Sequence, residues 1–313
     1  MSAIRAHHLR RTFGSVVAVD DLDLDVAEGE IFGLVGPDGA GKTTTMRMLA
    51  GILPPTSGTA RVADCDIVRD GARLKDHLGY MSQRFGLYPD LTVRENIEFY
   101  ADIYGVPARG RETRLARLLG FSNLTPFQQR LAGQLSGGMK QKLGLACALI
   151  HTPRVLFLDE PTNGVDPVSR RDFWRILYQL VREGVTLFVS TSYLDEAERC
   201  NRLALLHAGR LLGLGTPEEV KALMPGALLE VRTPAPRRTA ALLRAELPGF
   251  SVGLFGDRVH VAGGAAAAEI EPRLRELMAR AGFELQSVRP ITPSLEDVFV
   301  AVLAGRQEAG DAP

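Results

Sequence analysis

Short apolar runs recur along the chain, separated by longer segments in which apolar residues return every three or four positions. The clearest runs, rich in valine, isoleucine, leucine and phenylalanine, are residues 31–35, 155–158, 185–189 and 203–206. Continuous apolar runs are typical of strands buried on both faces, and helical segments between them favour parallel strand pairing. The pattern therefore predicts an α/β fold built on a largely parallel sheet.

Two departures from this alternation predict further parts of the fold. From about residue 84 to residue 150 the chain carries charged helical patterns, which predict a helical subdomain inserted into the α/β core. Residues 228–303 then follow the order strand, helix, two strands, helix, strand and a last helix, which predicts a small ferredoxin-like α+β domain. We expect a first domain over residues 1–224, an accessory domain over residues 225–304 and a disordered tail over residues 305–313.

The charge balance restricts the possible partners. Lysine and arginine number 37, and so do aspartate and glutamate, so no net field would draw the chain to nucleic acid or to an anionic membrane. The scattered cysteines Cys65, Cys147 and Cys200 and the lack of an apolar leader predict reduced thiols in the cytosol. Because no apolar run approaches the roughly 18 residues that span a bilayer, we expect any membrane role to come through a partner.

A glycine-rich loop follows the first apolar run. The sequence GPDGAGKT and the helical segment after it form the Walker A pattern in its strand–loop–helix context. Glycines let backbone N–H groups turn toward a phosphate, the lysine would neutralise the β- and γ-phosphates of ATP, and the threonine would bind Mg²⁺. Thr43 is therefore a predicted Mg²⁺ ligand. The predicted nucleotide contacts are Gly36, Pro37, Asp38, Gly39, Ala40, Gly41, Lys42, Thr43 and Thr44.

The second apolar run ends in two carboxylates, Asp159 and Glu160. By itself, an Asp-Glu pair at the end of a strand also fits a cap on the next helix. Together with the Walker A loop, the pair predicts Asp159 as a ligand of Mg²⁺ and Glu160 as the catalytic group that polarises the attacking water.

A segment just before that run carries a family resemblance. The sequence LSGGMKQ, residues 135–141, resembles the signature motif of ABC-type ATPases. A serine and two glycines open a helix there, so that N–H groups and the helix dipole face an anion. In that family the motif closes on the nucleotide held by the other subunit. The resemblance therefore implies a head-to-tail dimer with two ATP molecules between subunits, and nucleotide contacts from Ser136, Gly137 and Gly138.

Further motifs of the same family follow in order between residue 4 and about residue 224. The resemblance implies that Gln83 contacts Mg²⁺ and the attacking water, and that the sequence after it receives the coupling helix of a transmembrane partner. It also implies that Asp166 lies across the dimer interface and that Phe13 stacks on adenine. An aromatic residue at Phe13 also fits a buried core position.

Within this family the chain resembles the ATP-binding subunits of exporters for drugs, antibiotics or other hydrophobic or polymeric cargo. The segments EPTNGVDPVSRRDFW and TPSLEDVFVAVLAG carry that resemblance. It implies an ATP-hydrolysing motor subunit, peripheral on the inner face of the cell membrane and attached through a separate transmembrane permease. It identifies no cargo.

One position departs from the family pattern, because Ser192 stands where the family has a switch histidine that reaches the γ-phosphate. Losing one such contact costs roughly 2–4 kcal/mol, or about 10²–10³ in rate. Each composite site joins the Walker motifs of one chain to the signature of the other, so we expect a weak site here and a stronger one on a different cassette. A heterodimer is therefore favoured over a homodimer. Ser192 and Asp195 also have capping-box spacing, which predicts that the Ser192 hydroxyl caps the next helix.

Two other functions stay open. An ATP-binding regulatory subunit that hydrolyses poorly is favoured by Ser192. A soluble ABC protein acting on ribosomes or DNA is disfavoured by the single cassette and the neutral charge, so we expect no nucleic-acid partner. For His7 and His8, a solvated strand edge is preferred to a metal site, because no further ligands are spaced for one. Trp174 is predicted to be a packing residue.

Overall fold

The computed structural model describes residues 1–83, 86–264 and 266–308. The chain divides into two compact units, Met1–Leu211 and Leu212–Pro313. This division falls inside strand β10 (Arg210–Gly215), earlier than the predicted domain boundary after residue 224. The domain limits of 1–224 and 225–304 stay predictions.

The core of the first unit is a mostly parallel sheet, called the central sheet below, with the strand order β10-β9-β3-β8-β7-β6. Parallel pairing joins β6 to β7, β7 to β8, β8 to β3 and β3 to β9. Every residue of β3, β7 and β8 is buried, which is why these strands are continuous apolar runs in the sequence. The four predicted strands and the α/β class are confirmed. The strands are β3 (Ile31–Val35), β6 (Leu78–Met81), β7 (Val155–Asp159), β8 (Thr186–Thr191) and β9 (Arg202–His207).

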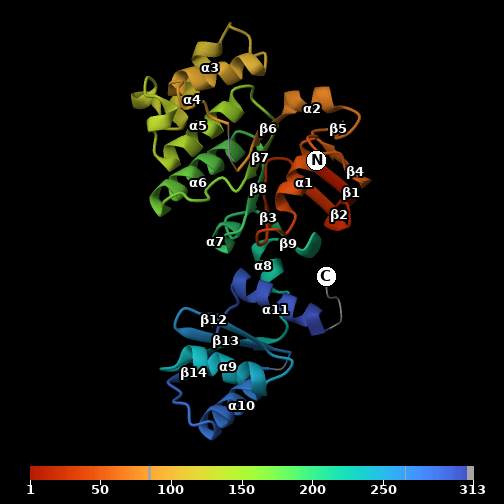
Figure 1. Cartoon of the computed structure of the whole chain (residues 1–313), viewed down its shortest axis with the longest axis vertical. Coiled ribbons are helices and arrows are strands. Elements are labelled where there is room, and N and C mark those ends of the chain that lie inside the picture. Colours follow the sequence, from red (N-terminus) through yellow and green to blue (C-terminus); the bar gives the residue numbers. More distant parts are fainter. Residues whose placement is uncertain (84–85, 265, 309–313) are drawn as a thin grey trace. The chain divides into compact units, whose positions relative to one another are not determined.

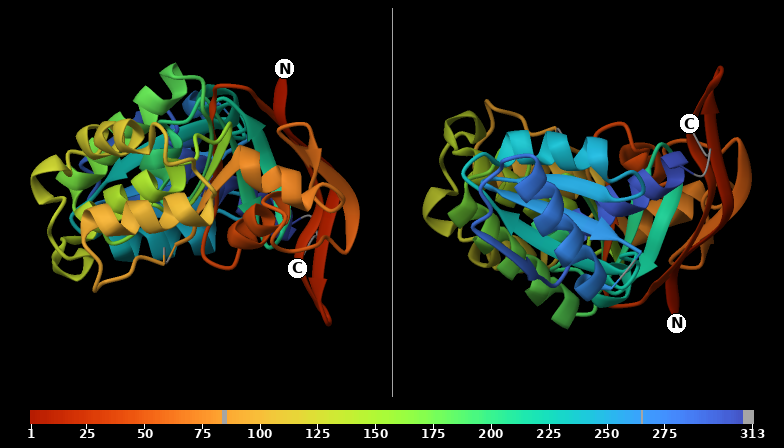
Figure 2. Two further views of the ribbon diagram at one scale, coloured as in Figure 1. Left: turned by 90° about the horizontal axis from the view of Figure 1, so that it is seen from above. Right: turned by 90° about the horizontal axis from the view of Figure 1, so that it is seen from below.

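An antiparallel sheet at the N-terminus lies on one side of the central sheet, opposite the helices coloured yellow and green (Figure 2, left). It consists of β1 (Ser2–Phe13), β2 (Val16–Ala27), β4 (Ser57–Val62) and β5 (Cys65–Asp66), in the order β2-β1-β4-β5. Its apolar face packs with α1 (Lys42–Leu49) and with part of the central sheet into one core. The predicted strand edge at His7 and His8 is confirmed, since both residues are exposed on β1. The other strands of this sheet were not predicted, although the burial of Leu22, Leu24 and Val26 between exposed aspartates is the alternation that indicates a strand.

The helices of the first unit follow the predicted organisation. Helices α3 (Val93–Ile103), α4 (Arg111–Phe121) and α5 (Gly137–Leu149) lie within the range 84–150, of which residues 84 and 85 fall outside the described residues. They share a core of their own with the short turns η1 (Thr125–Phe127) and η2 (Ala132–Gln134). The remaining helices are α2 (Gly71–His77), α6 (Pro167–Arg182) and α7 (Leu194–Ala197). The predicted packing role of Trp174 on α6 is confirmed, since it is 1% exposed.

The second unit contains α8 (Pro217–Lys221) and a sheet, called the C-terminal sheet below, with the order β12-β13-β11-β14. All of its pairings are antiparallel, and this is the predicted ferredoxin-like strand order. Figure 1 shows α9 and α10 on one face of the sheet and α11 on the other. The elements are β11 (Ala227–Arg232), α9 (Pro236–Glu246), β12 (Ser251–Phe255), β13 (Arg258–Gly263), α10 (Ala267–Arg280), β14 (Ser287–Pro290) and α11 (Leu295–Glu308).

The predicted disordered tail is corrected in part. Helix α11 extends to Glu308, so residues 305–308 are helical, whereas residues 309–313 lie outside the described residues. Within the described part of the chain, no helix combines the length and the apolar character needed to cross a bilayer.

A buried charge network joins the C-terminal sheet to α11. The Glu230 side chain is 3% exposed and accepts hydrogen bonds from Arg232 Nε at 3.1 Å and Arg289 Nε at 2.9 Å. His260 Nδ1 lies 2.6 Å from Asp297 Oδ1. Burial alone would raise both carboxyl pKa values, but the arginines around Glu230 and the histidine beside Asp297 outweigh it and hold each pKa below its ordinary value.

The three cysteines are all buried, each in a different hydrophobic core of the first unit. Cys65 belongs to the core under the N-terminal sheet, Cys147 to the core of the helices α3, α4 and α5, and Cys200 to the core between the central sheet and α6. Burial raises the pKa of the Cys147 thiol and raises that of Cys200 to about 12. Both thiols are therefore protonated at neutral pH.

Candidate functional site

The glycine-rich loop leaves β3 and enters α1 through positions that tolerate only glycine. A Cβ atom on Gly36 would collide with the carbonyl oxygen of Leu206, and one on Gly41 would collide with that of Ala18. Gly41 also has a φ of 101°. The loop borders a cavity of 180 Å³ lined by Ala18, Asp38, Gly39, Ala40, Gly41, Lys42, Thr43, Thr44, Gln83 and Glu160.

The Lys42 ammonium lies at the centre of this loop and is 6% exposed. It donates hydrogen bonds to the Gly36 carbonyl at 2.6 Å, the Pro37 carbonyl at 3.0 Å and Ser192 Oγ at 3.1 Å. Its Nζ also lies 3.0 Å from Glu160 Oε1. The opposite charge of Glu160 compensates the burial of this cation.

Two hard oxygen ligands meet next to the loop. Thr43 Oγ1 donates a hydrogen bond to Asp159 Oδ1 at 3.1 Å, and Ser190 Oγ donates to the same oxygen at 2.6 Å. Tyr80 donates to Asp159 Oδ2 at 3.3 Å, and burial together with the charge of Asp159 raises the pKa of Tyr80 to about 12, so it stays a donor. A hydroxyl and a carboxylate at this separation fit Mg²⁺, which prefers oxygen ligands.

Glu160 is held in an unusual backbone conformation, with a φ of 50°. Its N–H donates to Ser190 Oγ at 2.9 Å, and its side chain is 7% exposed. Positive φ is rare for residues other than glycine and persists where the surroundings hold the backbone firmly. The end of β7 therefore presents the Glu160 carboxylate in one defined place.

The predicted cap at Ser192 is wrong. Ser192 Oγ donates to Glu160 Oε1 at 2.7 Å and accepts from Lys42, so its hydroxyl bonds two residues that line the cavity and does not cap α7. The N-cap residue of α7 is Tyr193, whose N–H donates to Thr191 Oγ1 at 3.0 Å. The capping-box spacing failed as a signal because a buried carboxylate competes for the serine hydroxyl.

The signature residues form a second group, at the start of α5. Ser136 is the N-cap and accepts a hydrogen bond from the Met139 N–H at 3.3 Å. A Cβ on Gly138 would lie 2.6 Å from the Ser169 side chain, so α5 begins against the start of α6. Asp166 caps α6, and the hydrogen bond from the Ser169 N–H lowers its pKa. Ser136, Gly137 and Asp166 are exposed, which leaves this helix end accessible to an anion.

The structure brings Gln83 together with Lys42, Thr43 and Glu160 around the loop cavity. Phe13 is 47% exposed, so the core interpretation of this residue is wrong. The Arg11 guanidinium lies 4.6 Å from the centre of the Phe13 ring. The catalytic, nucleotide and metal roles assigned to the site residues stay predictions.

Sequence reasoning missed two residues that hold the site. Ser190 pairs with Asp159 in the sheet and bonds both Asp159 and Glu160, and Tyr80 bonds Asp159 from β6. A hydroxyl residue near the end of a buried strand was the available signal for Ser190, because parallel strands end at the same edge of a sheet.

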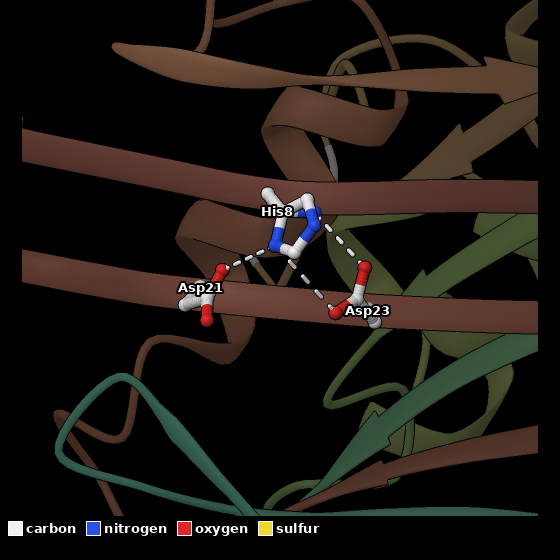
Figure 3. A group of neighbouring side chains, drawn as sticks. All are labelled: His8, Asp21 and Asp23. Carbon is white, nitrogen blue, oxygen red and sulfur yellow. Dashed lines mark hydrogen bonds and ion pairs between the residues drawn. The ribbon is translucent and has the colours of Figure 1, made fainter.

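A separate polar cluster lies on the N-terminal sheet (Figure 3). His8 Nδ1 is 2.7 Å from Asp21 Oδ1 and 3.9 Å from Asp23 Oδ2, so the expectation that no further ligands stand near His8 is wrong. All three side chains are more than half exposed. The hydrogen bond to Asp21 and the charge of Asp23 raise the pKa of His8, which favours an imidazolium and hence an ion pair over metal ligation.

Comparisons with known proteins agree with this geometry. The family model for ABC transporters matches residues 19–163. Over 290 residues the chain is 46% identical to "Probable multidrug ABC transporter ATP-binding protein YbhF" of Escherichia coli K12, covering 92% of this chain and 49% of that protein. The chain thus spans about half the length of that relative. It is 35% identical over 315 residues to "Nod factor export ATP-binding protein I" of Rhizobium etli, covering 98% and 95% of the two chains.

Among solved structures, an ATP-binding subunit of an ABC transporter matches with a TM-score of 0.64 at 27% identity, over 70% of this chain and 92% of that one. Together with the relatives above, this confirms the resemblance drawn from the motifs. The chain belongs to the family of ABC transporter ATP-binding proteins.

Proposed function

We propose that this chain is the ATP-binding and ATP-hydrolysing motor subunit of an ABC exporter. The observation that carries the proposal is the contact set Lys42–Glu160–Ser192, in which Lys42 and Glu160 are buried and which lies next to Thr43 and Asp159 around one glycine-rich loop. A cation, a carboxylate and two hard oxygen ligands beside a loop of N–H groups fit a nucleoside triphosphate with its metal.

Each residue has a defined task in this proposal. Lys42 exchanges its contact with Glu160 for the β- and γ-phosphates, and Glu160 then accepts a proton from the attacking water. Thr43, Gln83 and Asp159 would hold the metal. When bound, Mg²⁺ neutralises charge on the β- and γ-phosphates. Phe13 stacks on the adenine with its exposed ring face.

The exposed start of α5 supports a dimer. Ser136, Gly137 and Gly138 would bind the γ-phosphate held by a second cassette, with Asp166 at the same interface. Because Ser192 lacks the reach and charge of a histidine, the site on this chain's own Walker loop would be the weaker one. We therefore favour a heterodimer with a second ABC ATPase subunit.

The exporter assignment rests on the relatives. One relative carries a multidrug name and another a Nod factor export name, which supports export while leaving the cargo open between drug, antibiotic and other hydrophobic or polymeric molecules. A separate transmembrane permease would bind the chain and keep it on the cytoplasmic face of the membrane. Residues 1–224 would be the ATP-binding domain and residues 225–304 the accessory domain.

A second candidate function is a regulatory subunit that binds ATP and hydrolyses it slowly. Ser192 favours it, because its hydroxyl donates a hydrogen bond to Glu160 and stands where the family's histidine would contact the γ-phosphate.

Co-purification from membranes, followed by ATPase assays, tests these proposals. We expect a multi-span membrane protein to copurify with the chain, and Mg²⁺-dependent turnover that Glu160→Gln in this chain reduces. A complex that turns over ATP at an unchanged rate after Glu160→Gln in this chain supports the regulatory function. Recovery with ribosomes or DNA and without a membrane protein contradicts the exporter proposal.

A further inference from the structure

A fully buried carboxylate lies next to the two strand ends that carry Glu160 and Ser192. Glu196, on α7, is 0% exposed. One of its oxygens accepts a hydrogen bond from Thr162 Oγ1 at 2.5 Å, and the other accepts from Thr191 Oγ1 at 3.0 Å. Burying an ionised carboxylate costs free energy even when its oxygens are paired, so hydrophobic packing alone does not explain this residue.

The two threonines belong to the catalytic segments. Thr162 follows Glu160 by two residues in the turn after β7, and Thr191 directly precedes Ser192 at the end of β8. A single carboxylate therefore ties together the two chain segments whose side chains meet at 2.7 Å in the Ser192–Glu160 hydrogen bond. Any shift of one segment against the other would change that distance.

A third segment reaches the same carboxylate. Arg170 Nε lies 3.4 Å from Glu196 Oε1, and the Arg170 guanidinium lies 4.3 Å from the centre of the Tyr193 ring. Arg170 belongs to the first turns of α6, the helix that Asp166 caps. Glu196 thus also connects the Asp166 turn to the ends of β7 and β8.

We propose that Glu196 is a positioning residue for hydrolysis: its two oxygens fix Thr162 and Thr191 and thereby hold Glu160 in place against Ser192 and Lys42. The inference rests on the proposed ATPase function. Among the described residues, the Glu196 carboxylate contacts Thr162, Thr191 and Arg170, none of which belongs to the glycine-rich loop that we propose binds the phosphates. Its loss should therefore lower kcat and leave the affinity for ATP unchanged.

Glu196→Gln is the direct test, because it keeps the size of the side chain and replaces one acceptor by a donor. A small displacement of a reacting group costs up to about 10²-fold. We therefore expect the kcat of this chain's own site, measured with the catalytic glutamate of the partner cassette inactivated, to fall about 10- to 100-fold. The Kd for a fluorescent ATP analogue should change less than about twofold, in line with retained loop contacts. Asp195→Asn is the matched control: Asp195 lies on the same helix, is 67% exposed and pairs with Arg170 at 3.9 Å, and its loss should leave kcat unchanged.

Thr191→Val supplies a second variant that keeps the buried shape and removes one of the two hydroxyls. It should also lower kcat at constant Kd, and the double variant with Glu196→Gln should lose less than the sum of the two single losses, because both act through one contact. Wild-type kcat in both single variants would overturn the inference while leaving the ATPase proposal intact. Equal losses of kcat and ATP affinity, in step with a lower melting temperature, would overturn it as well. A wild-type complex with no turnover at all would overturn both proposals.

Discussion

Replacing Ser192 by histidine tests the weak-site proposal most directly. Ser192 is exposed, so the larger side chain can be accommodated, and an imidazole extends several ångströms farther than a hydroxyl toward the phosphates that we propose Lys42 binds. If this site is slow because it lacks a γ-phosphate contact, the substitution restores that contact.

The expected magnitude follows from two opposing effects. A preorganised contact to developing charge is worth roughly 2–4 kcal/mol. The substitution also removes the 2.7 Å hydrogen bond from Ser192 to the Glu160 carboxylate. A hydrogen bond to a charged group is worth about 1.5–3 kcal/mol, and partial exposure of Ser192 places this one toward the lower limit. The net gain is about 0.5–2.5 kcal/mol, and its midpoint corresponds to roughly a 10-fold rise in kcat.

The assay is ATP turnover by the purified complex under single-turnover conditions, with the Kd for ATP measured in parallel. To isolate this chain's own Walker site, the partner cassette carries an inactivating change in its catalytic glutamate. We expect a faster turnover at an unchanged Kd, and a lower melting temperature because the Glu160 hydrogen bond is lost. Fast turnover in the wild type, unaffected by Ser192→His but abolished by Glu160→Gln, would refute the reasoning and favour a competent homodimer.

Three further predictions concern other parts of the chain. Lys42→Ala should abolish binding of a fluorescent ATP analogue, since it removes the cation of the loop and leaves the buried Glu160 carboxylate without a neutralising positive charge. Asp166→Ala should lower the free energy of unfolding by about 1 kcal/mol, read from denaturant titration, because it deletes the cap of α6. Folding lowers the pKa values of Glu230 and Asp297 below 4.5 and 3.8, so their stabilisation is present above pH 4.5 and is lost as the pH falls further. Hydrogen exchange in residues 227–290 should show that loss, and Asp297→Asn should reduce its dependence on pH.

Much of the central sheet could be predicted from sequence because strands buried on both faces leave a continuous apolar run. Beyond the strand edge at His7 and His8, the N-terminal sheet was not predicted, because its strands are half exposed and the charges on their outer face break up the apolar pattern. In β2, buried apolar residues still alternate with exposed charged ones. In β1, irregular pairing with β2 interrupts the alternation of buried and exposed residues.

In the site, motif spacing located the loop, Asp159 and Glu160, because each follows directly from a strand end. It could not assign the Ser192 hydroxyl: the capping-box spacing indicated the start of the next helix, whereas the partners of this hydroxyl in space are Glu160 and Lys42. Glu160 lies 32 residues away along the chain and reaches Ser192 only because β7 and β8 are neighbours. For the same reason the sequence did not indicate the carboxylates beside His8: Asp21 and Asp23 lie on the adjacent strand β2 and are close to His8 only in the folded sheet.

Because of where the cysteines lie, their reactivity can report local opening of the protein. One thiol lies in each of three separate cores, and the unit that begins at Leu212 has none. A thiol reagent can react only when a core exposes its sulfur, so timed labelling followed by mass spectrometry gives an opening rate for each core without an added probe. Bound nucleotide should lower the labelling rate most for the cysteine whose core it stabilises most. The three changes in rate would therefore rank the three cores by their response to ATP.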